Sequence, residues 1–252
     1  MNNLEINLQG RVVLISGANR GIGLAIAIEL LERGAKKVYA GTRNLEAFAS
    51  VESTFEGRLI PIQLDVTDES SIEKAANKAS DVDILINNAG VLQGDSLLTR
   101  DALNNFKTHF DVNVLGLLKL TQAFLPQIRK SDKGAIVSIS SLAGLGNMPM
   151  IGSYSVSKAA VHSIIQGLRA ELQADKVLVI GVYPGPIETD MTKGFEMDMD
   201  APQTVASNIA NALETGLEDV FPDKMSMEIS AIYQSSPKTI ETEFGKFKGS
   251  AE

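Results

Sequence analysis

The stretch Gly17-Ala18-Asn19-Arg20-Gly21-Ile22-Gly23 decides the fold of this 252-residue chain. A short apolar run at residues 11–16 comes directly before it and is typical of a buried strand. Residues 24–33 have the composition of a helix, and Gly34 suits the C-terminal end of that helix. A strand, a glycine turn and a helix in this order indicate a phosphate-binding site, because glycines allow close backbone approach and the helix N-terminus offers free N–H groups. The alternative is a tight connection that binds nothing.

Apolar runs and helical segments alternate along the rest of the chain. Further strands are expected at residues 37–41, 59–64, 82–86, 134–140, 177–183 and 219–221. Helices are expected at residues 68–79, with Thr67 as N-cap, and at residues 96–128, 152–174 and 201–216. The alternation predicts an α/β fold in which residues 1–252 form a single Rossmann-like domain. Its doubly wound parallel sheet has about seven strands, with helices on both faces. Residues 222–252 form a C-terminal extension, helical in parts, that packs on the domain or trails from it.

Glycine and polar residues follow the predicted strands. In sheets of this kind, ligands bind at the carboxyl ends of the strands. The segments found there are the glycine turn, Arg43, Asp65, residues 87–90, Ser141 and residues 184–189. We therefore expect one binding site along this edge of the sheet.

Arg43 indicates which cofactor this site binds. In dinucleotide folds, an acid after the second strand binds the 2′-hydroxyl of the adenosine ribose, whereas an arginine accommodates a 2′-phosphate. Arg43 stands at this place, and no carboxylate follows before Glu46. Arg20, within the glycine turn, could reach the same phosphate. Two such arginines favour NADP(H), and the alternative is that both are solvated surface residues.

The chemistry is expected at Tyr154 and Lys158. They are four residues apart and share one face of the predicted helix. An ammonium near a phenol favours the phenolate, so Lys158 is expected to lower the pKa of Tyr154 from its usual value near ~10. Tyr154 then becomes a proton donor or acceptor near neutral pH. Taken alone, a Tyr and Lys at this spacing are usually a solvated helix face.

Composition narrows the classes of function. Lys and Arg number 23 and Asp and Glu 31, so the net charge is −8. An acidic chain is unsuited to nucleic acid or to anionic membrane surfaces. The absence of cysteine excludes disulfides and thiolate metal sites, and it fits a reducing compartment. The start lacks a basic and apolar leader, and no apolar run approaches about 20 residues, so we expect a cytoplasmic protein.

Six motifs together resemble the short-chain dehydrogenase/reductase family over residues 9–221. In the order of the family they are the glycine turn, Asn-Asn-Ala-Gly at residues 87–90, Asn113, Ser141, the Tyr154-x-x-x-Lys158 pair and Pro184-Gly185. The resemblance implies an NADP-preferring, carbonyl reductase-like enzyme that transfers hydride between the nicotinamide and a carbonyl or secondary alcohol. The alternative is a non-catalytic NADP-binding sensor or scaffold of the same fold.

The same resemblance implies four catalytic residues. Tyr154 is the acid in carbonyl reduction and the base in alcohol oxidation. Lys158 lowers the pKa of Tyr154 and holds the ribose hydroxyls of the nicotinamide side. Ser141 binds the substrate oxygen; Ser140 is its neighbour, but only Ser141 has the Ser-x-x-Gly spacing. Asn113 anchors a water that links Lys158 to solvent, or else it is a buried amide at a helix kink.

The expected cofactor contacts extend over the whole edge of the sheet. They are Gly17, Asn19, Arg20, Gly21, Ile22, Gly23, Thr42, Arg43, Asp65, Val66, Asn87, Ala89, Gly90, Tyr154, Lys158, Pro184, Gly185, Ile187 and Thr189. No metal is expected, because His109 and His162 without cysteine make a poor ligand set and are interpreted as structural.

Two departures from the family concern the substrate and the assembly. The segment after Thr189 is short, and its apolar residues Phe195, Met197 and Met199 could cover a small-molecule carbonyl or alcohol. The opposite wall could come from Leu142, Met148, Met150 and Ile151, although ordinary packing explains them equally well. The chain also lacks the Gly-Gly ending that is frequent in tetrameric relatives. A tetramer is therefore doubtful, and a homodimer through residues 96–128 and 152–174 is the expected alternative.

Overall fold

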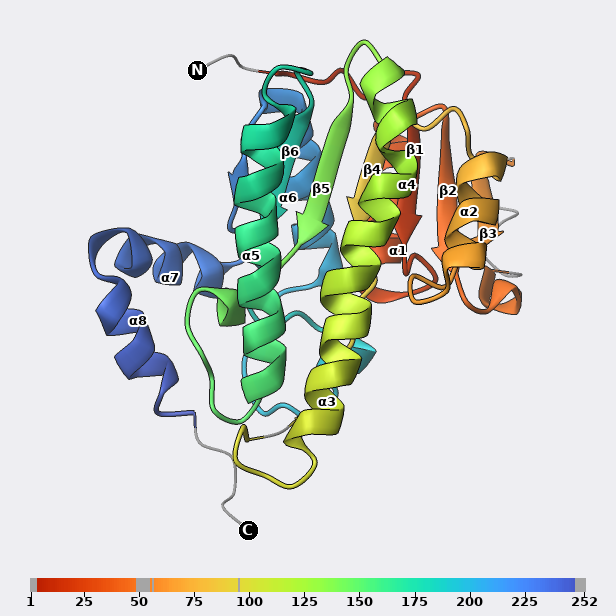
Figure 1. Cartoon of the computed structure of the whole chain (residues 1–252). Coiled ribbons are helices and arrows are strands. Elements are labelled where there is room, and N and C mark those ends of the chain that lie inside the picture. Colours follow the sequence, from red (N-terminus) through yellow and green to blue (C-terminus); the bar gives the residue numbers. More distant parts are fainter. Residues whose placement is uncertain (1–3, 49–54, 56, 95, 248–252) are drawn as a thin grey trace.

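One sheet of seven parallel strands forms the centre of the protein. The computed structural model describes residues 4–48, 55, 57–94 and 96–247 (Figure 1). The strand order is β3-β2-β1-β4-β5-β6-β7. The strands are β1 (Val12–Ser16), β2 (Lys37–Thr42), β3 (Leu59–Gln63), β4 (Ile84–Asn87), β5 (Ala135–Ile139), β6 (Leu178–Val182) and β7 (Asp219–Val220). The first three strands are added toward one edge of the sheet and β4 to β7 toward the other, so the strand order reverses between β1 and β4, as in doubly wound folds. The predicted fold class is confirmed.

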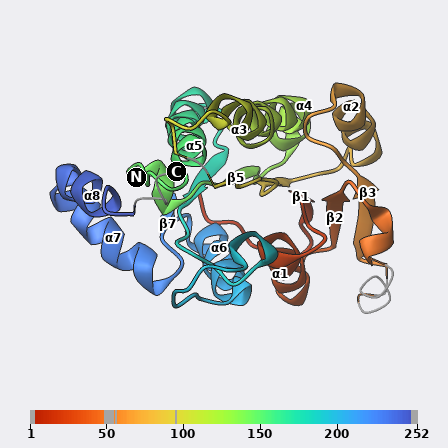
Figure 2. The same ribbon diagram turned by 90° about the horizontal axis from the view of Figure 1, so that it is seen from below.

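Helices cover both faces of the sheet (Figure 2). One face carries α2 (Glu69–Lys78), α3 (Ala102–His109), α4 (Leu117–Lys130) and α5 (Gly152–Leu172), and the other α1 (Gly21–Glu32) and α6 (Pro202–Thr215). Every residue of β1, β4, β5 and β6 is buried, which explains why these strands are almost uninterrupted apolar runs in the sequence. Within the part of the chain that the structure describes, no helix has the length and hydropathy needed to span a membrane.

The long helical region predicted at residues 96–128 runs without a break from Ala102 to Lys130, but it starts later than predicted and contains a π-helical segment. Turns at residues 97–101 precede α3, and a π-helical segment, η3 (Phe110–Gly116), separates α3 from α4. Asn113 lies within η3, and its amide group binds the backbone of Val91 in a different part of the chain. Apolar periodicity continues through this segment, so the pattern does not predict the wider turn.

The N-cap of α2 is Asp68 and not Thr67. The carboxylate of Asp68 accepts a hydrogen bond from the backbone N–H of Ser70 at 2.9 Å. The hydroxyl of Thr67 donates instead to Oδ1 of Asp65 at 2.7 Å. Thr67 therefore stabilises the turn that follows β3.

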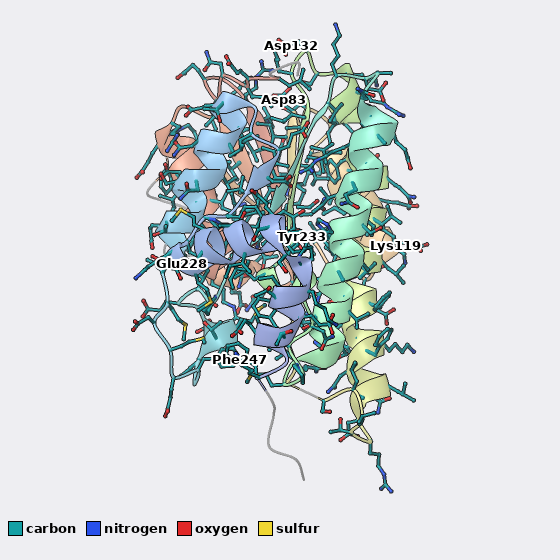
Figure 3. The ribbon with its side chains drawn as sticks, turned by 90° about the vertical axis from the view of Figure 1, so that its left-hand side faces the viewer. Asp83, Lys119, Asp132, Glu228, Tyr233 and Phe247 are labelled. Atoms are coloured by element: carbon teal, nitrogen blue, oxygen red, sulfur yellow. The ribbon has the colours of Figure 1, made fainter. Side chains whose placement is uncertain are left out.

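The C-terminal extension packs on the rest of the protein as a helical hairpin. It consists of α7 (Lys224–Ser235) and α8 (Pro237–Phe244), which lie beside α5 (Figure 1). Figure 3 faces this hairpin and labels Glu228 and Tyr233 on α7. Ile240 and Phe244 of α8 form a small apolar cluster with Leu142 of the β5–α5 connection. Residues 248–252 lie outside the described part of the chain.

Asp223 anchors this hairpin to the sheet edge. It is 2% exposed and is the N-cap of α7, where it accepts a hydrogen bond from the N–H of Ser226 at 2.9 Å. Its second oxygen accepts from the N–H of Gly185 at 2.8 Å, in the loop after β6. One buried carboxylate therefore satisfies donors from two segments.

We predict that Asp223→Ala lowers the free energy of unfolding by about 2–4 kcal/mol, because it removes both a helix cap and a charge-assisted hydrogen bond. Asp68→Ala is the matched control, since this exposed carboxylate caps only its own helix and its loss should cost about 1 kcal/mol. Urea unfolding of both variants measures the difference. Equal losses would contradict the bridging role of Asp223.

Candidate functional site

Lys158 is fixed where α5 packs against the end of β5. Its Nζ donates to the carbonyl oxygen of Ile139 at 2.8 Å, and its own carbonyl oxygen accepts from Oγ of Ser140 at 3.1 Å. The helix approaches so closely that a Cβ on Gly144 would lie 2.6 Å from that same carbonyl oxygen. Ser140 therefore anchors α5, and the Ser-x-x-Gly spacing reflects the need for glycine at position 144.

Tyr154 lies one turn before Lys158 and faces Ser141. The hydroxyl of Ser141 lies near enough to the phenol to act on its pKa, which it tends to lower. Oγ of Ser141 also accepts from the N–H of Ala143 at 3.2 Å, so its position is set by the turn after β5. The phenol is 8% exposed and lies in an apolar cluster with Ala143, Ile151, Leu92 and Met148. The structure thus brings Ser141, Tyr154 and Lys158 together, as the sequence predicted.

The pKa of Tyr154 differs from the expectation. Burial raises it to about 12, although the Ser141 hydroxyl acts in the opposite direction. Burial also lowers the pKa of Lys158 to about 8, and its Nζ is 5.6 Å from the centre of the Tyr154 ring. Desolvation therefore determines the direction of both pKa shifts, and the prediction of a lowered tyrosine pKa was wrong for this structure. At neutral pH the phenol carries its proton.

Asn113 occupies the other side of Lys158 as a buried amide in the helix distortion. Oδ1 accepts from the N–H of Val91 at 2.8 Å, and Nδ2 donates to the carbonyl oxygen of Val91 at 3.0 Å and to Oγ of Ser157 at 3.0 Å. A Cβ on Gly90 would lie 3.3 Å from Oδ1 of Asn113 and 3.8 Å from Nζ of Lys158. Asn113 therefore holds the segment after β4 against the Tyr154–Lys158 helix.

The glycine turn has the shape of a phosphate cradle. Gly17 and Gly21 have φ angles of +67° and +53°, which favour glycine, and a Cβ on Gly23 would lie 2.4 Å from the carbonyl oxygen of Gly17. The helix α1 begins at Gly21, three residues earlier than predicted, and its N-cap residue Arg20 makes no side-chain capping hydrogen bond. The first-turn N–H groups of α1 are therefore suited to an anionic ligand. Asn19 and Ile22 are half-buried in this turn.

Asn88 and Ser16 support this cradle, and sequence reasoning assigned a role to neither. Nδ2 of Asn88 donates to the carbonyl oxygens of Ser16 and Gly17 at 2.9 and 3.0 Å. Oγ of Ser16 accepts from the N–H groups of Asn88 and Ala89 at 3.1 and 3.0 Å. Both residues stand at the carboxyl end of an apolar strand, Ser16 as its last residue and Asn88 directly after it, and this placement is the signal in the sequence. Asn87 points elsewhere, since its Nδ2 donates to Oγ1 of Thr121 at 2.9 Å.

The two arginines are held by different partners. Arg20 forms an exposed ion pair with Asp190, with a distance of 2.6 Å between Nη1 and Oδ2. Arg43 lines a pocket of about 450 Å³ together with Thr67, Asp111 and Lys119. Burial opposes ionisation of Asp65, but hydrogen bonds from Thr67 and the charge of Arg43 prevail and lower its pKa. Of the two arginines, Arg43 therefore lies with Asp65 and Thr67 after β3, whereas Arg20 is paired with Asp190.

Three further cofactor candidates lie around this pocket and the adjoining strand ends. The side chain of Thr42 is buried and bonded to the backbone of Asn44, and Val66 packs closely against Gly116. The backbone of Ala89 lies 3.1 Å from the position of a Cβ on Gly17, beside the cradle. These contacts place all three at the carboxyl edge of the sheet.

The loop after β6 completes the site. The carbonyl oxygen of Pro184 accepts from the N–H of Leu142 at 3.1 Å, which joins this loop to the turn after β5. Ile187 is buried and pairs with Asp200 in an isolated parallel bridge. Thr189 lies beside the glycine turn, where its Cγ2 would be 3.3 Å from a Cβ on Gly21.

Two of the apolar residues predicted to cover the substrate lie against helix α1. Phe195 and Met199 line a pocket of about 640 Å³ with Leu24 and Ile28 of α1. Of the proposed opposite wall, Met148 and Ile151 do contact the Tyr154 cluster. Leu142 lies under α8, and Met150 is 36% exposed.

Comparison with known proteins agrees with this geometry. The model of the short chain dehydrogenase family matches residues 11–200. A 3-oxoacyl-[acyl-carrier-protein] reductase of Aquifex aeolicus is 38% identical over 197 residues, which cover 75% of this chain and 79% of the relative. A short-chain dehydrogenase of Burkholderia cenocepacia, solved in complex with NADP, has a TM-score of 0.88 and 33% identity, covering 95% of this chain and 99% of that one. The structure of ElxO with NADP bound has a TM-score of 0.78 and 27% identity, covering 87% and 100%. The chain belongs to the short-chain dehydrogenase family.

Proposed function

We propose that the protein is an NADP(H)-dependent oxidoreductase that reduces a carbonyl compound to a secondary alcohol, with Tyr154 as the proton donor. One observation carries the proposal: a buried phenol faces the side chain of Ser141 one turn before a buried lysine. The reverse reaction, alcohol oxidation, would require Tyr154 to accept a proton instead. The pKa of about 12 favours the donor role at neutral pH.

The residues present fit a nicotinamide dinucleotide. The uncapped start of α1 and the glycine cradle suit a pyrophosphate, and Arg43 suits a 2′-phosphate. The NADP-bound relatives support the same cofactor. Gly90 and Lys158, which lie close together, would hold the nicotinamide side. When bound, the cofactor supplies the hydride.

The chain's own groups handle the oxygen and the proton. Ser141 would donate a hydrogen bond to the substrate oxygen, where negative charge develops as hydride reaches the carbon. Tyr154 would then transfer its proton to that oxygen, which completes the alcohol. The Lys158 ammonium would stabilise the phenolate that remains. The proton returns to Tyr154 from solvent.

The surroundings of Tyr154 favour an uncharged substrate. The four side chains clustered around the phenol are apolar: Leu92, Ala143, Met148 and Ile151. No counter-charge for a carboxylate or phosphate stands among these four. The 3-oxoacyl group reduced by the Aquifex relative has a ketone of the same chemical kind. A non-catalytic sensor, the alternative from the sequence, finds no support in the family match.

Replacing Tyr154 by phenylalanine tests the proposal. The variant keeps the ring but loses the proton donor, so kcat for NADPH-dependent reduction of a ketone panel should fall at least 100-fold. NADPH binding, followed by its fluorescence, should change less than about threefold. Turnover equal to that of the unmodified protein would refute the mechanism, and NADPH binding without turnover on any carbonyl would refute the enzymatic function.

The rate of reduction should fall as the pH rises through about 8. Tyr154, with a pKa of about 12, stays protonated, whereas Lys158 changes from mostly ammonium at pH 7 to mostly neutral amine at pH 9. Loss of the ammonium removes the charge that favours proton release from the phenol. The profile of kcat/KM for NADPH reports the pKa values of the free enzyme and is the quantity to measure. A flat profile between pH 6 and 10 would rule out this role for Lys158.

Arg43→Asp should reverse the preference for NADPH over NADH. A charge-assisted hydrogen bond to the phosphate is worth about 1.5–3 kcal/mol, so the ratio of the two kcat/KM values should change at least tenfold. Arg129→Asp is the control, because it makes the same charge change away from this pocket. Arg43 lines the pocket with Lys119 in the first turn of α4, whereas Arg129 lies in the last turn and pairs with Asp175. If both variants keep the original ratio, Arg43 does not contact the 2′-phosphate.

A further inference from the structure

His109, at the end of α3, is fully buried and bonded on both ring nitrogens. Nε2 accepts from the backbone N–H of Gln93 at 2.9 Å, and Nδ1 lies 2.8 Å from Oγ of Ser153. A backbone N–H can only donate, so Nε2 must carry no hydrogen. The proton is therefore on Nδ1, which donates to Ser153, and the imidazole is neutral in this arrangement.

Asn113, four residues later, makes the same pattern of contacts. Its Oδ1 accepts from the N–H of Val91, two residues before Gln93, and its Nδ2 donates to Ser157, four residues after Ser153. Two parallel connections thus join the same three segments: α3 with η3, the loop at residues 91–93, and α5. Each ends on a serine that directly precedes a reacting residue, since Tyr154 follows Ser153 and Lys158 follows Ser157.

The His109 ring also contacts the phenol itself. The ring centres of His109 and Tyr154 are 5.8 Å apart, with an angle of 74° between the planes, which is an edge-to-face arrangement. Leu92, between the two anchored loop residues, packs in the cluster around Tyr154. His109 therefore restricts the position of the phenol in three ways: by direct ring contact, through the backbone of α5 at Ser153, and through the loop at residues 91–93.

We infer that His109 is a positioning residue for Tyr154: it holds the phenol against Ser141 by joining Ser153 to the backbone of Gln93. This rests on the proposed function, in which Tyr154 donates the proton. Misplacement of a reacting group by about 1 Å can cost on the order of 100-fold in rate. His109 itself does not touch the reacting atoms in this scheme.

The test compares three substitutions of His109. His109→Leu keeps a similar volume and removes both hydrogen bonds, so kcat should fall about 10- to 100-fold while the Kd for NADPH changes less than threefold. His109→Asn keeps an amide near the Nδ1 position for Ser153, and His109→Gln keeps an acceptor near Nε2 for Gln93. Both should recover part of the lost kcat, and this rescue would not be expected of a merely space-filling residue.

His162→Leu is the matched control. This second histidine lies on α5, is bonded to Tyr183, and stands outside the connections described here. It should keep kcat within twofold of the unmodified protein. Equal losses in the two leucine variants, or an unchanged kcat in folded His109→Leu, would overturn the inference. If the leucine variant does not fold, full kcat in both the asparagine and glutamine variants would overturn it instead.

A crystal structure of the His109 variants separates this inference from the proposed function. Absence of turnover by the unmodified protein contradicts the proposed function alone. The inference is then tested by the position of the Tyr154 ring. The ring should be rotated or displaced from Ser141 in His109→Leu. If the leucine variant does not fold, the same displacement is expected in His109→Asn. An unchanged ring position overturns it whatever the activity.

Discussion

The contact between α5 and the end of β5 is the constraint on which the site depends. A buried ammonium is costly unless its hydrogens find acceptors, and Lys158 donates one of its three to the carbonyl oxygen of Ile139. The hydroxyl of Ser140 and the missing side chain of Gly144 allow the helix to come close enough. Once Lys158 is fixed in this way, helical geometry directs Tyr154 toward Ser141. The Lys158 pKa of about 8 and the Tyr154 pKa of about 12 follow from the same burial.

The two halves of the sheet contribute different parts of the site, and they meet at the end of β4. On one side, Asn88 joins the end of β4 to the glycine turn after β1. On the other, Asn113 joins the next few residues to α5. Gly90 lies between these connections, within reach of Lys158. This arrangement places the glycine turn and the buried phenol on opposite sides of one short segment, which is what the proposed hydride transfer needs.

The sequence predicts the fold well because buried parallel strands are recognisable as apolar runs. The family resemblance carried by six motifs predicts the grouping of Ser141, Tyr154 and Lys158. Four features could not be found in this way. The π-helical turn contains Asn113, whose partners Val91 and Ser157 are distant in the sequence. The capping of α2 depends on a local competition, in which Thr67 binds Asp65 and leaves the cap to Asp68. The direction of the Tyr154 pKa shift depends on how much water the fold excludes, which a Tyr-x-x-x-Lys pattern does not state. The pairing of Arg20 with Asp190 joins residues 170 positions apart.

The most direct test of the account is a crystal structure of the protein with NADP(H) and a substrate analogue or product alcohol. If Ser141 and Tyr154 act as proposed, the oxygen of this ligand lies within about 2.5–3.2 Å of both Oγ of Ser141 and the hydroxyl of Tyr154, with the 2′-phosphate beside Arg43. A ligand oxygen held away from both hydroxyls, with the nicotinamide bound in a productive position, would contradict it.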